Sequence, residues 1–334
     1  MPTQQPPASA GPPFVAVNPV ASRVHDPDRR QRIVGEVERA VLARTGRPPE
    51  VHVAGSRRDM RERVRAAVEA GSPLVVAIGG DGTVRDVATI LMGRQTPLAI
   101  VPAGTANLFA ATVGVPGDAE RAARAIADAR DRPVDLGVAT WGTDDGGASE
   151  PRIFVVAAGL GFDALLMAAT DSAAKRRLGR YAYFLTGARM LRHVRGVPVR
   201  LEADGTVVET TAIQVLVANG GDLLPGLVGP ALPIDPDDGL LDVLVVEGRG
   251  LLDGIRGGLE VLLRRGMGPS GSGRSRRLRA ARVRVSGPPD QPVEVDGDVV
   301  GAGWLEATCR PRALHVLVPD RSSTPSGPRR EKRR

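Results

Sequence analysis

The sequence predicts an α/β domain with a parallel sheet, followed by a β-rich domain whose strands run antiparallel. Apolar strands alternate with helical patterns over residues 14–133, and repeated strand–helix units form parallel sheets with right-handed crossovers. Residues 74–78 are an uninterrupted apolar run, which is typical of a strand covered on both faces. After Asp135 strands dominate, and Asp204–Gly205 and Asp296–Gly297 are hairpin-turn dipeptides.

The first half pairs each strand with a following helix. In the first helix, Ile33, Val37 and Val41 recur at the spacing of one helical face. Strands are expected at Phe14–Val17, Val51–Val53, Leu74–Ile78 and Leu98–Val101. The helices that follow them are expected at Asp28–Arg44, Arg58–Ala70, Val84–Met92 and Ala106–Thr112.

The second half begins with a polar loop over residues 142–150 and contains no internal repeat. Two helices are expected in it, at Ser172–His193 and Leu251–Arg265. Its strands are expected at Arg152–Ala158, Val199–Ala203, Val207–Gln214, Val215–Ala218, Leu241–Val246, Ala281–Ser286, Val293–Val295 and Leu314–Val318. We therefore expect domains over 14–134 and 135–319, between disordered tails at 1–13 and 320–334, the second tail basic.

The composition is that of a basic globular chain. Its 334 residues carry a formal net charge of +7, which suits an anionic partner. Aromatic residues make up only 3% of the chain, so stacking platforms are scarce and no nucleic-acid partner is expected. The single cysteine, Cys309, excludes an internal disulfide and a cysteine-based metal cluster. With neither a signal peptide nor a run of roughly eighteen apolar residues, we expect a cytoplasmic protein.

The strongest local signal is the segment Gly79–Thr83, in which three glycines follow a buried strand and lead into a helix. Gly79, Gly80 and Gly82 permit a close backbone approach, and the helix N-terminus directs N–H groups at an anion. Thr83 and Asp86 match a capping box at the helix start. A tight strand-to-helix turn is the alternative. Asp81 favours the phosphate-binding interpretation. A carboxylate beside bound phosphates is destabilised by like charge unless a metal or a proton transfer uses it, so its presence among the glycines indicates such a use.

A second segment, Pro102–Asn107, repeats this design after the next strand. Gly104 permits a close approach, while Thr105 and Asn107 offer a hydroxyl and an amide. Asn18 ends the first strand, and the carboxyl ends of parallel strands meet at the edge where open α/β sheets bind ligands. Each segment alone is compatible with a simple helix cap, whereas together they predict one phosphate-binding site.

These segments resemble the catalytic domain of the diacylglycerol kinase and sphingosine kinase family. The resemblance covers residues 14–319, and five blocks in the family's order make it specific. The matching blocks are Asn18–Pro19, Gly79–Thr83, Pro102–Asn107, Ala218–Gly220 with Asp237–Asp242, and Asp296–Asp298.

The resemblance implies a Rossmann-like N-terminal domain, similar to those of phosphofructokinases and NAD kinases, and a C-terminal antiparallel β-sandwich. ATP would lie between them. Asp81 would join a magnesium-linked catalytic network, Asp296 would be the base facing a lipid hydroxyl, and Asp298 would belong to the same catalytic group. A structural magnesium would be held by the carbonyls of Asp235 and Leu240 and the carboxylate of Asp238. The nucleotide would be held by Asn18, Pro19, Ser22, Gly79, Gly80, Gly82, Thr83, Arg85, Gly104, Thr105 and Asn107.

Five positions depart from the family's usual pattern. Arg23 follows Ser22 where a glycine is common, and Leu108 stands where many members have aspartate. Arg85–Asp86 replaces Asn-Glu, so that Arg85 adds a candidate phosphate contact, and Asp298 replaces the usual Glu. Without the resemblance, the turn containing Asp296 is equally compatible with an ordinary type I′ hairpin.

The expected partner is a lipid substrate, met at the inner face of a membrane. Lys175–Phe184 mixes basic and aromatic residues, as at a headgroup interface, although a helix packed on the sheet is the alternative. Residues 266–278 are expected to form a flexible basic loop. The sequence leaves open which lipid is used and whether the chain forms a homodimer. The alternative functions are an NAD kinase-like enzyme with a soluble substrate and a catalytically silent lipid- or nucleotide-binding module.

Overall fold

The computed structural model describes residues 11–161, 195–220, 234–250, 252–254, 256–257 and 275–320. The expected helix Ser172–His193 and the segment Lys175–Phe184 lie outside the described residues, as do most of Leu251–Arg265 and of both tails.

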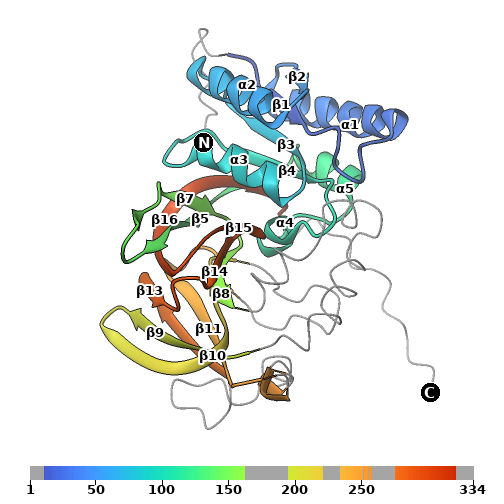
Figure 1. The fold of residues 1–334 in the computed structure, drawn as a ribbon. Coiled ribbons are helices and arrows are strands. Elements are labelled where there is room, and N and C mark those ends of the chain that lie inside the picture. Colours follow the sequence, from blue (N-terminus) through green and yellow to red (C-terminus); the bar gives the residue numbers. More distant parts are fainter. Residues whose placement is uncertain are drawn as a thin grey trace, which may run out of the picture.

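Four parallel strands form the sheet of the N-terminal half, in the spatial order β2-β1-β3-β4. Their interiors are apolar on both faces, as the uninterrupted apolar runs predicted. The parallel sheet expected from the sequence is therefore confirmed (Figure 1). The strands are β1 (Phe14–Val17), β2 (Glu50–Val53), β3 (Val75–Gly79) and β4 (Leu98–Pro102).

Helices cover both faces of this sheet. The helices α1 (Pro27–Thr45) and α5 (Ala119–Ala125) pack on one face, and α2 (Arg57–Glu69) and α3 (Asp81–Leu91) on the other. Buried side chains of opposite strand faces join the two helical layers in separate clusters. The short helix α4 (Leu108–Thr112) follows β4. The three layers place the carboxyl ends of β1, β3 and β4 at one edge of the sheet.

The strands of the C-terminal half pair in antiparallel fashion and enclose a second apolar core. Both predicted hairpin turns are present, with left-handed φ angles at Asp204 (43°) and Asp296 (47°). The strands are β5 (Arg130–Thr143), β6 (Gly147–Ala148), β7 (Arg152–Phe154), β8 (Ala157–Gly161), β9 (Val197–Ala203), β10 (Thr206–Ala218), β11 (Leu241–Glu247), β12 (Ser275–Ala280), β13 (Arg282–Ser286), β14 (Pro292–Val295), β15 (Asp298–Ala302) and β16 (Trp304–Val318).

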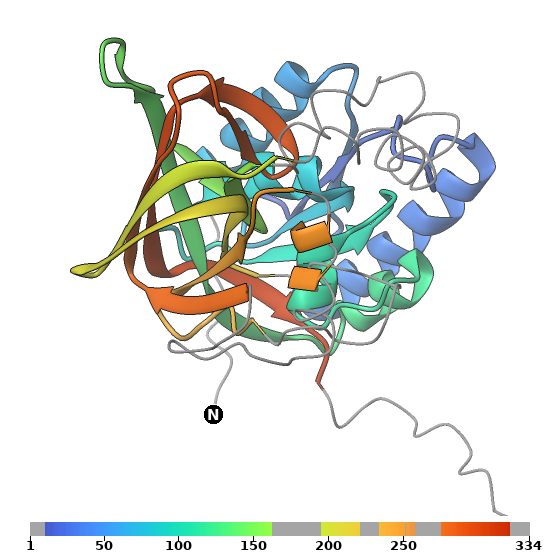
Figure 2. The same cartoon turned by 60° about the horizontal axis from the view of Figure 1, so that its bottom comes forward.

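The strand β16 connects the two halves. It pairs with β5 along almost its whole length and with β13 near its start. Near its end, Val316 pairs in parallel with Leu98 of β4, so that the C-terminal strand extends the N-terminal sheet. One continuous sheet therefore runs from the helical side of the molecule to the antiparallel side (Figure 2).

Several expected elements differ from the structure. Residues 152–158 form two strands, β7 and β8, whereas residues 206–218 form one strand with a register shift after Ala212. The expected loop 142–150 contains the β5–β6 hairpin. The described end of the expected basic loop 266–278 belongs to β12, whose arginines Arg276 and Arg277 pair with carboxylates of β11. Among the described residues, no helix is both long and apolar enough to span a membrane.

Candidate active site

The segment Gly79–Thr83 forms the junction between β3 and α3. A Cβ on Gly79 would lie 2.4 Å from Oγ1 of Thr83, so only glycine fits there. Gly80 is the N-cap residue, and a Cβ on Gly82 would meet no heavy atom within 4 Å. The N-terminal N–H groups of α3 carry the partial positive charge of the helix dipole. The junction therefore presents backbone donors beside open space, as anion binding requires.

The predicted capping box at this helix is wrong. The helix begins at Asp81, its N-cap Gly80 has no side chain, and no side-chain cap bond forms there. Asp86 instead pairs with Arg57, whose Nη2 donates to Oδ1 at 2.6 Å. Thr83 is used differently too, because its Oγ1 accepts from Nδ2 of Asn18 at 2.9 Å.

The second predicted segment contacts the first directly. The N–H of Ala103 donates to the carbonyl of Gly79 at 2.8 Å. A Cβ on Gly104 would lie only 2.5 Å from Cα of Gly80, so the two backbones touch through glycines. Asn107 is left-handed (φ 53°), and its amide closes the turn by accepting from the Gly104 N–H and donating to the Gly104 carbonyl. The structure thus brings the two segments together, with the exposed Thr105 at the turn.

Asp81 bridges the two segments through its side chain. Its Oδ1 accepts from the N–H of Phe109 at 3.1 Å, in the first turn of α4. This contact fixes the carboxylate at the shared edge of β3 and β4. An oxygen ligand of this kind suits magnesium.

The end of the first strand reaches the same edge. The N–H of Asn18 donates to the Ile78 carbonyl at 3.0 Å, and the hydroxyl of the exposed Ser22 donates to the Ala103 carbonyl at 3.3 Å. Between them, Pro19 is partly exposed. The guanidinium of Arg23, which stands where the family usually has glycine, donates to the Gly117 carbonyl. Residues 18–22 therefore lie against both glycine segments.

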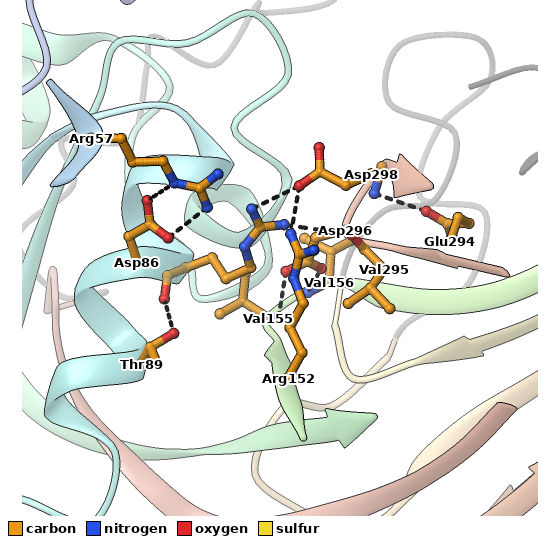
Figure 3. Close-up of polar contacts among 12 residues, drawn as sticks. Arg57, Asp86, Thr89, Arg152, Val155, Val156, Glu294, Val295, Asp296 and Asp298 are labelled. Atoms are coloured by element: carbon orange, nitrogen blue, oxygen red, sulfur yellow. Dashed lines mark hydrogen bonds and ion pairs between the residues drawn. The ribbon is translucent and has the colours of Figure 1, made fainter. Parts of the chain in front are cut away.

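Asp296 lies at the tip of the β14–β15 hairpin, and its carboxylate accepts three backbone hydrogen bonds. The donors are the N–H groups of Val155 (3.0 Å) and Val156 (2.9 Å), between β7 and β8, and of Ala157 (3.2 Å), the first residue of β8. Figure 3 shows Val155 and Val156 beside Asp296. Desolvation raises the pKa of Asp296 to about 6, although these three donors and the positive charge of Arg85 act in the opposite direction. The carboxyl is thus held in one orientation with a pKa suited to accepting a proton near neutrality.

Helix α3 brings the two halves of the site together. Its N-terminus carries Asp81, and Arg85, about 6 Å further along the helix axis, reaches the Asp296 hairpin. Nη2 of Arg85 pairs with Oδ2 of Asp298 at 2.9 Å, and Nη1 donates to the Val295 carbonyl at 3.5 Å. The side chain of Arg85, predicted as a nucleotide contact, is thus buried against the hairpin.

In the loop where a structural magnesium was predicted, both oxygens of the Asp238 carboxylate already have partners. Oδ1 of Asp238 accepts from the Leu240 N–H at 3.0 Å, and Oδ2 pairs with Arg279. Asp235 and Asp237 share Arg132, at 3.3 Å and 2.7 Å. Among the described residues, no group of three His, Cys, Asp or Glu side chains is arranged to hold a metal ion. Two guanidinium groups therefore supply positive charge at this loop. The predicted magnesium, held by two backbone carbonyls and one carboxylate, stays a prediction.

The sequence analysis missed two residues that organise these loops. Asp135 is buried, and its carboxylate accepts from the N–H groups of Gly239 and Arg312, both at 2.7 Å. Arg152 pairs with Asp298 at 2.5 Å. All three contacts join residues more than a hundred positions apart, so no local pattern marks Asp135 or Arg152.

Comparisons with known proteins find a match for each half of the chain. Residues 13–139 match the family described as diacylglycerol kinase catalytic domain. Residues 155–318 match the family described as YegS C-terminal NAD kinase beta sandwich-like domain. Together the two matches cover both sides of the site.

Individual relatives are similar over most of the chain. A probable lipid kinase YegS-like from Pseudomonas aeruginosa is 33% identical over 89% of this chain and 94% of its own length. An uncharacterized protein from Synechocystis is 27% identical over 82% of this chain, which spans 62% of that protein. Among solved structures, a putative diacylglycerol kinase from Bacillus anthracis superposes with a TM-score of 0.74, at 22% identity, covering 97% of this chain and all of that one. This last likeness supports the fold alone.

Proposed function

Because the chain belongs to the diacylglycerol kinase catalytic-domain family, with a YegS-type β-sandwich domain, we propose that it transfers the γ-phosphoryl group of ATP to the hydroxyl of a lipid. Kinase family membership by itself supports a phosphotransferase. The finer assignment, a diacylglycerol-like alcohol as acceptor, is our proposal.

The observation that carries the proposal is the shared position of α3. Its N-terminus joins the two glycine segments, and Arg85 on the same helix contacts the hairpin that carries Asp296. A phosphate at the helix N-terminus would therefore lie about one helical turn from Arg85, which contacts the hairpin of Asp296, a carboxylate with a raised pKa. Phosphoryl transfer needs mainly this kind of positioning and charge neutralisation.

Each residue then has a defined task. Backbone N–H groups around Gly80 and Gly104 bind the phosphates, and Asn18 orients Thr83 beside them. Asp81 would hold the magnesium that accompanies the nucleotide, and this ion would neutralise charge on the transferring group. Asp296 accepts the proton of the acceptor hydroxyl.

The proposed acceptor is a lipid presented at the inner face of a membrane, with the protein bound peripherally. Relatives named as probable lipid kinases support this choice. The basic balance of the chain, +7, favours approach to an anionic surface.

Labelled ATP tests the proposal directly. Wild-type protein, magnesium and mixed vesicles containing diacylglycerol or a sphingoid base should yield labelled lipid in the organic phase. Asp81→Ala and Asp296→Ala should each lower this rate by a factor on the order of a hundred or more, while circular dichroism remains that of the folded protein.

Two other outcomes identify the alternatives. Labelled water-soluble product without labelled lipid would indicate an NAD kinase-like enzyme. ATP or lipid binding without turnover would indicate a catalytically silent module, a reading motivated by Arg23 and Leu108 at positions where the family usually has other residues.

A further inference from the structure

We propose that Asp298 is a positioning residue: together with Arg85 and Arg152 it fixes the hairpin that carries Asp296 against helix α3 and the β7–β8 turn. These three residues are called the Asp298 cluster below. The inference rests on the proposed function, and it gives Asp298 a different task from the chemical one suggested by its position in the Asp296–Asp298 block.

The first step concerns the buried charge of Arg85. Its side chain is only 4% exposed, whereas that of Asp298 is 50% exposed. A buried guanidinium requires a paired acceptor, because an unpaired buried charge is strongly unfavourable. The neighbouring carboxylate on α3, Asp86, already pairs with Arg57 (Figure 3). Asp298 is therefore the carboxylate that pairs directly with Arg85, while the buried Asp296 lies near enough for the charge of Arg85 to lower its pKa.

The second step concerns the other partner of Asp298. Arg152 begins β7, and the next residues along the chain, Val155 to Ala157, donate the three N–H groups that hold Asp296. Nη2 atoms of Arg85 and Arg152 share Oδ2 of Asp298, at 2.9 Å and 2.5 Å. One oxygen thus joins the helix of Asp81 to the segment that orients Asp296.

The third step separates positioning from proton transfer. Desolvation alone would raise the pKa of Asp298, but Arg85 and Arg152 outweigh it and lower the pKa below its ordinary value. A carboxylate of low pKa is a weak proton acceptor at neutral pH. Asp296, two residues earlier, has the opposite shift. The two carboxylates of one hairpin are therefore divided between chemistry and placement.

Hydrogen–deuterium exchange tests the placement without requiring activity. Asp298→Asn and Arg85→Met should each accelerate amide exchange in residues 292–302, and the double variant should exchange no faster than the faster single variant. Arg152→Met, which changes a partly exposed side chain, replaces Arg85→Met if that variant does not fold. The matched control is Glu306→Gln, because Glu306 also pairs with two arginines, Arg282 and Arg284, but contacts neither α3 nor the hairpin through them.

Kinetics provide the second readout. In the lipid kinase assay, Asp298→Asn and Arg85→Met should each lower kcat by about 100-fold, the loss expected when reacting groups are misplaced by roughly an ångström. The KM for ATP should change far less, and Asp298→Glu, which keeps the carboxylate, should recover most of kcat. Glu306→Gln should leave kcat and hairpin exchange unchanged.

Two results would overturn the inference. One is unchanged hairpin exchange in the Asp298 and Arg85 variants, or equal acceleration by Glu306→Gln. The other is a loss of kcat in Asp298→Asn with none in Arg85→Met, which would assign Asp298 to the chemistry. If the wild-type protein phosphorylates no lipid, the proposed function fails, and the exchange data alone still decide the placement.

Discussion

At the scale of single residues, Asp296 has a backbone conformation that few non-glycine residues adopt, with φ at 47°. Aspartate tolerates this region better than most residues, and the following glycine allowed the sequence to predict the turn. The three N–H groups that hold the carboxylate lie about 140 positions earlier in the chain. The turn was therefore predictable from the sequence, whereas the environment that raises the pKa of Asp296 was not.

The pH dependence of catalysis should report Asp296. Its carboxyl must be ionised to accept a proton, so kcat should rise with pH through a midpoint of about 6. Below that midpoint it should fall about tenfold per pH unit. Arg85→Met should move the midpoint upward, because the charge of Arg85 lowers the pKa of Asp296. A profile of kcat, measured at saturating substrate, that stays flat between about pH 5 and about pH 8 would contradict a proton-accepting role for Asp296.

Two glycine variants should separate contact from ligand binding. In Gly104→Ala the new Cβ would lie 2.5 Å from Cα of Gly80 and 2.9 Å from Oδ1 of Asn107, so the two segments must separate. We expect a loss of about 1–3 kcal/mol in unfolding free energy together with weaker ATP binding. In Gly82→Ala the Cβ enters open space, so stability should be retained while ATP binding weakens.

Denaturant unfolding and calorimetric titration with an ATP analogue measure these two quantities. Weaker binding in neither variant would contradict the assignment of these glycines to the phosphates. Equal destabilisation by both variants would contradict the packing argument for Gly104.

At the scale of elements, local signals located the first four parallel strands and most antiparallel strands but not their ends, and they missed α5, β5, β12, β15 and the first two thirds of β16. The expected helix Val84–Met92 begins three residues earlier, at Asp81, because Gly80 serves as its N-cap and no side-chain cap is needed. The strand β5 went unpredicted because its first residues, Arg130 to Arg132, are charged and it is paired along its length by β16. The ends and edges of these elements thus depend on partners distant in sequence.

The loop of residues 235–240 provides an element-scale prediction. Arg132 and Arg279 pair with its three carboxylates, so each carboxylate of the loop already has a cationic partner. Addition of a chelator should therefore leave the Tm of the wild-type protein unchanged. In Arg132→Met, the carboxylates of Asp235 and Asp237 lose their shared partner, and magnesium should then raise the Tm.

A wild-type Tm that falls on chelation would contradict this prediction and support a structural magnesium at the loop. Arg58→Met provides the control, because Arg58 pairs on the helix surface with Glu62 alone and its loss should create no response to magnesium.

At the scale of the whole molecule, the α/β first half and the antiparallel second half were both predictable, because hydrophobic patterns and hairpin dipeptides are local. The way in which the two halves connect was not predictable from the sequence. Val316 of β16 joins the N-terminal sheet beside Leu98, and β5 runs through the expected junction at residues 134–135. The ion pair between Arg85 and Asp298 joins positions 213 residues apart. Such contacts arise only from the folded topology, and they bring the parts of the candidate site together.

The most direct test of the account is a structure of the protein with magnesium and a non-hydrolysable ATP analogue. We predict that the triphosphate lies against the backbone of Gly80, Gly82 and Gly104, with its terminal phosphate facing the carboxylate of Asp296. A nucleotide bound elsewhere, or bound at the glycines with its terminal phosphate directed away from Asp296, would contradict the central claim that α3 and the β14–β15 hairpin form one phosphoryl-transfer site.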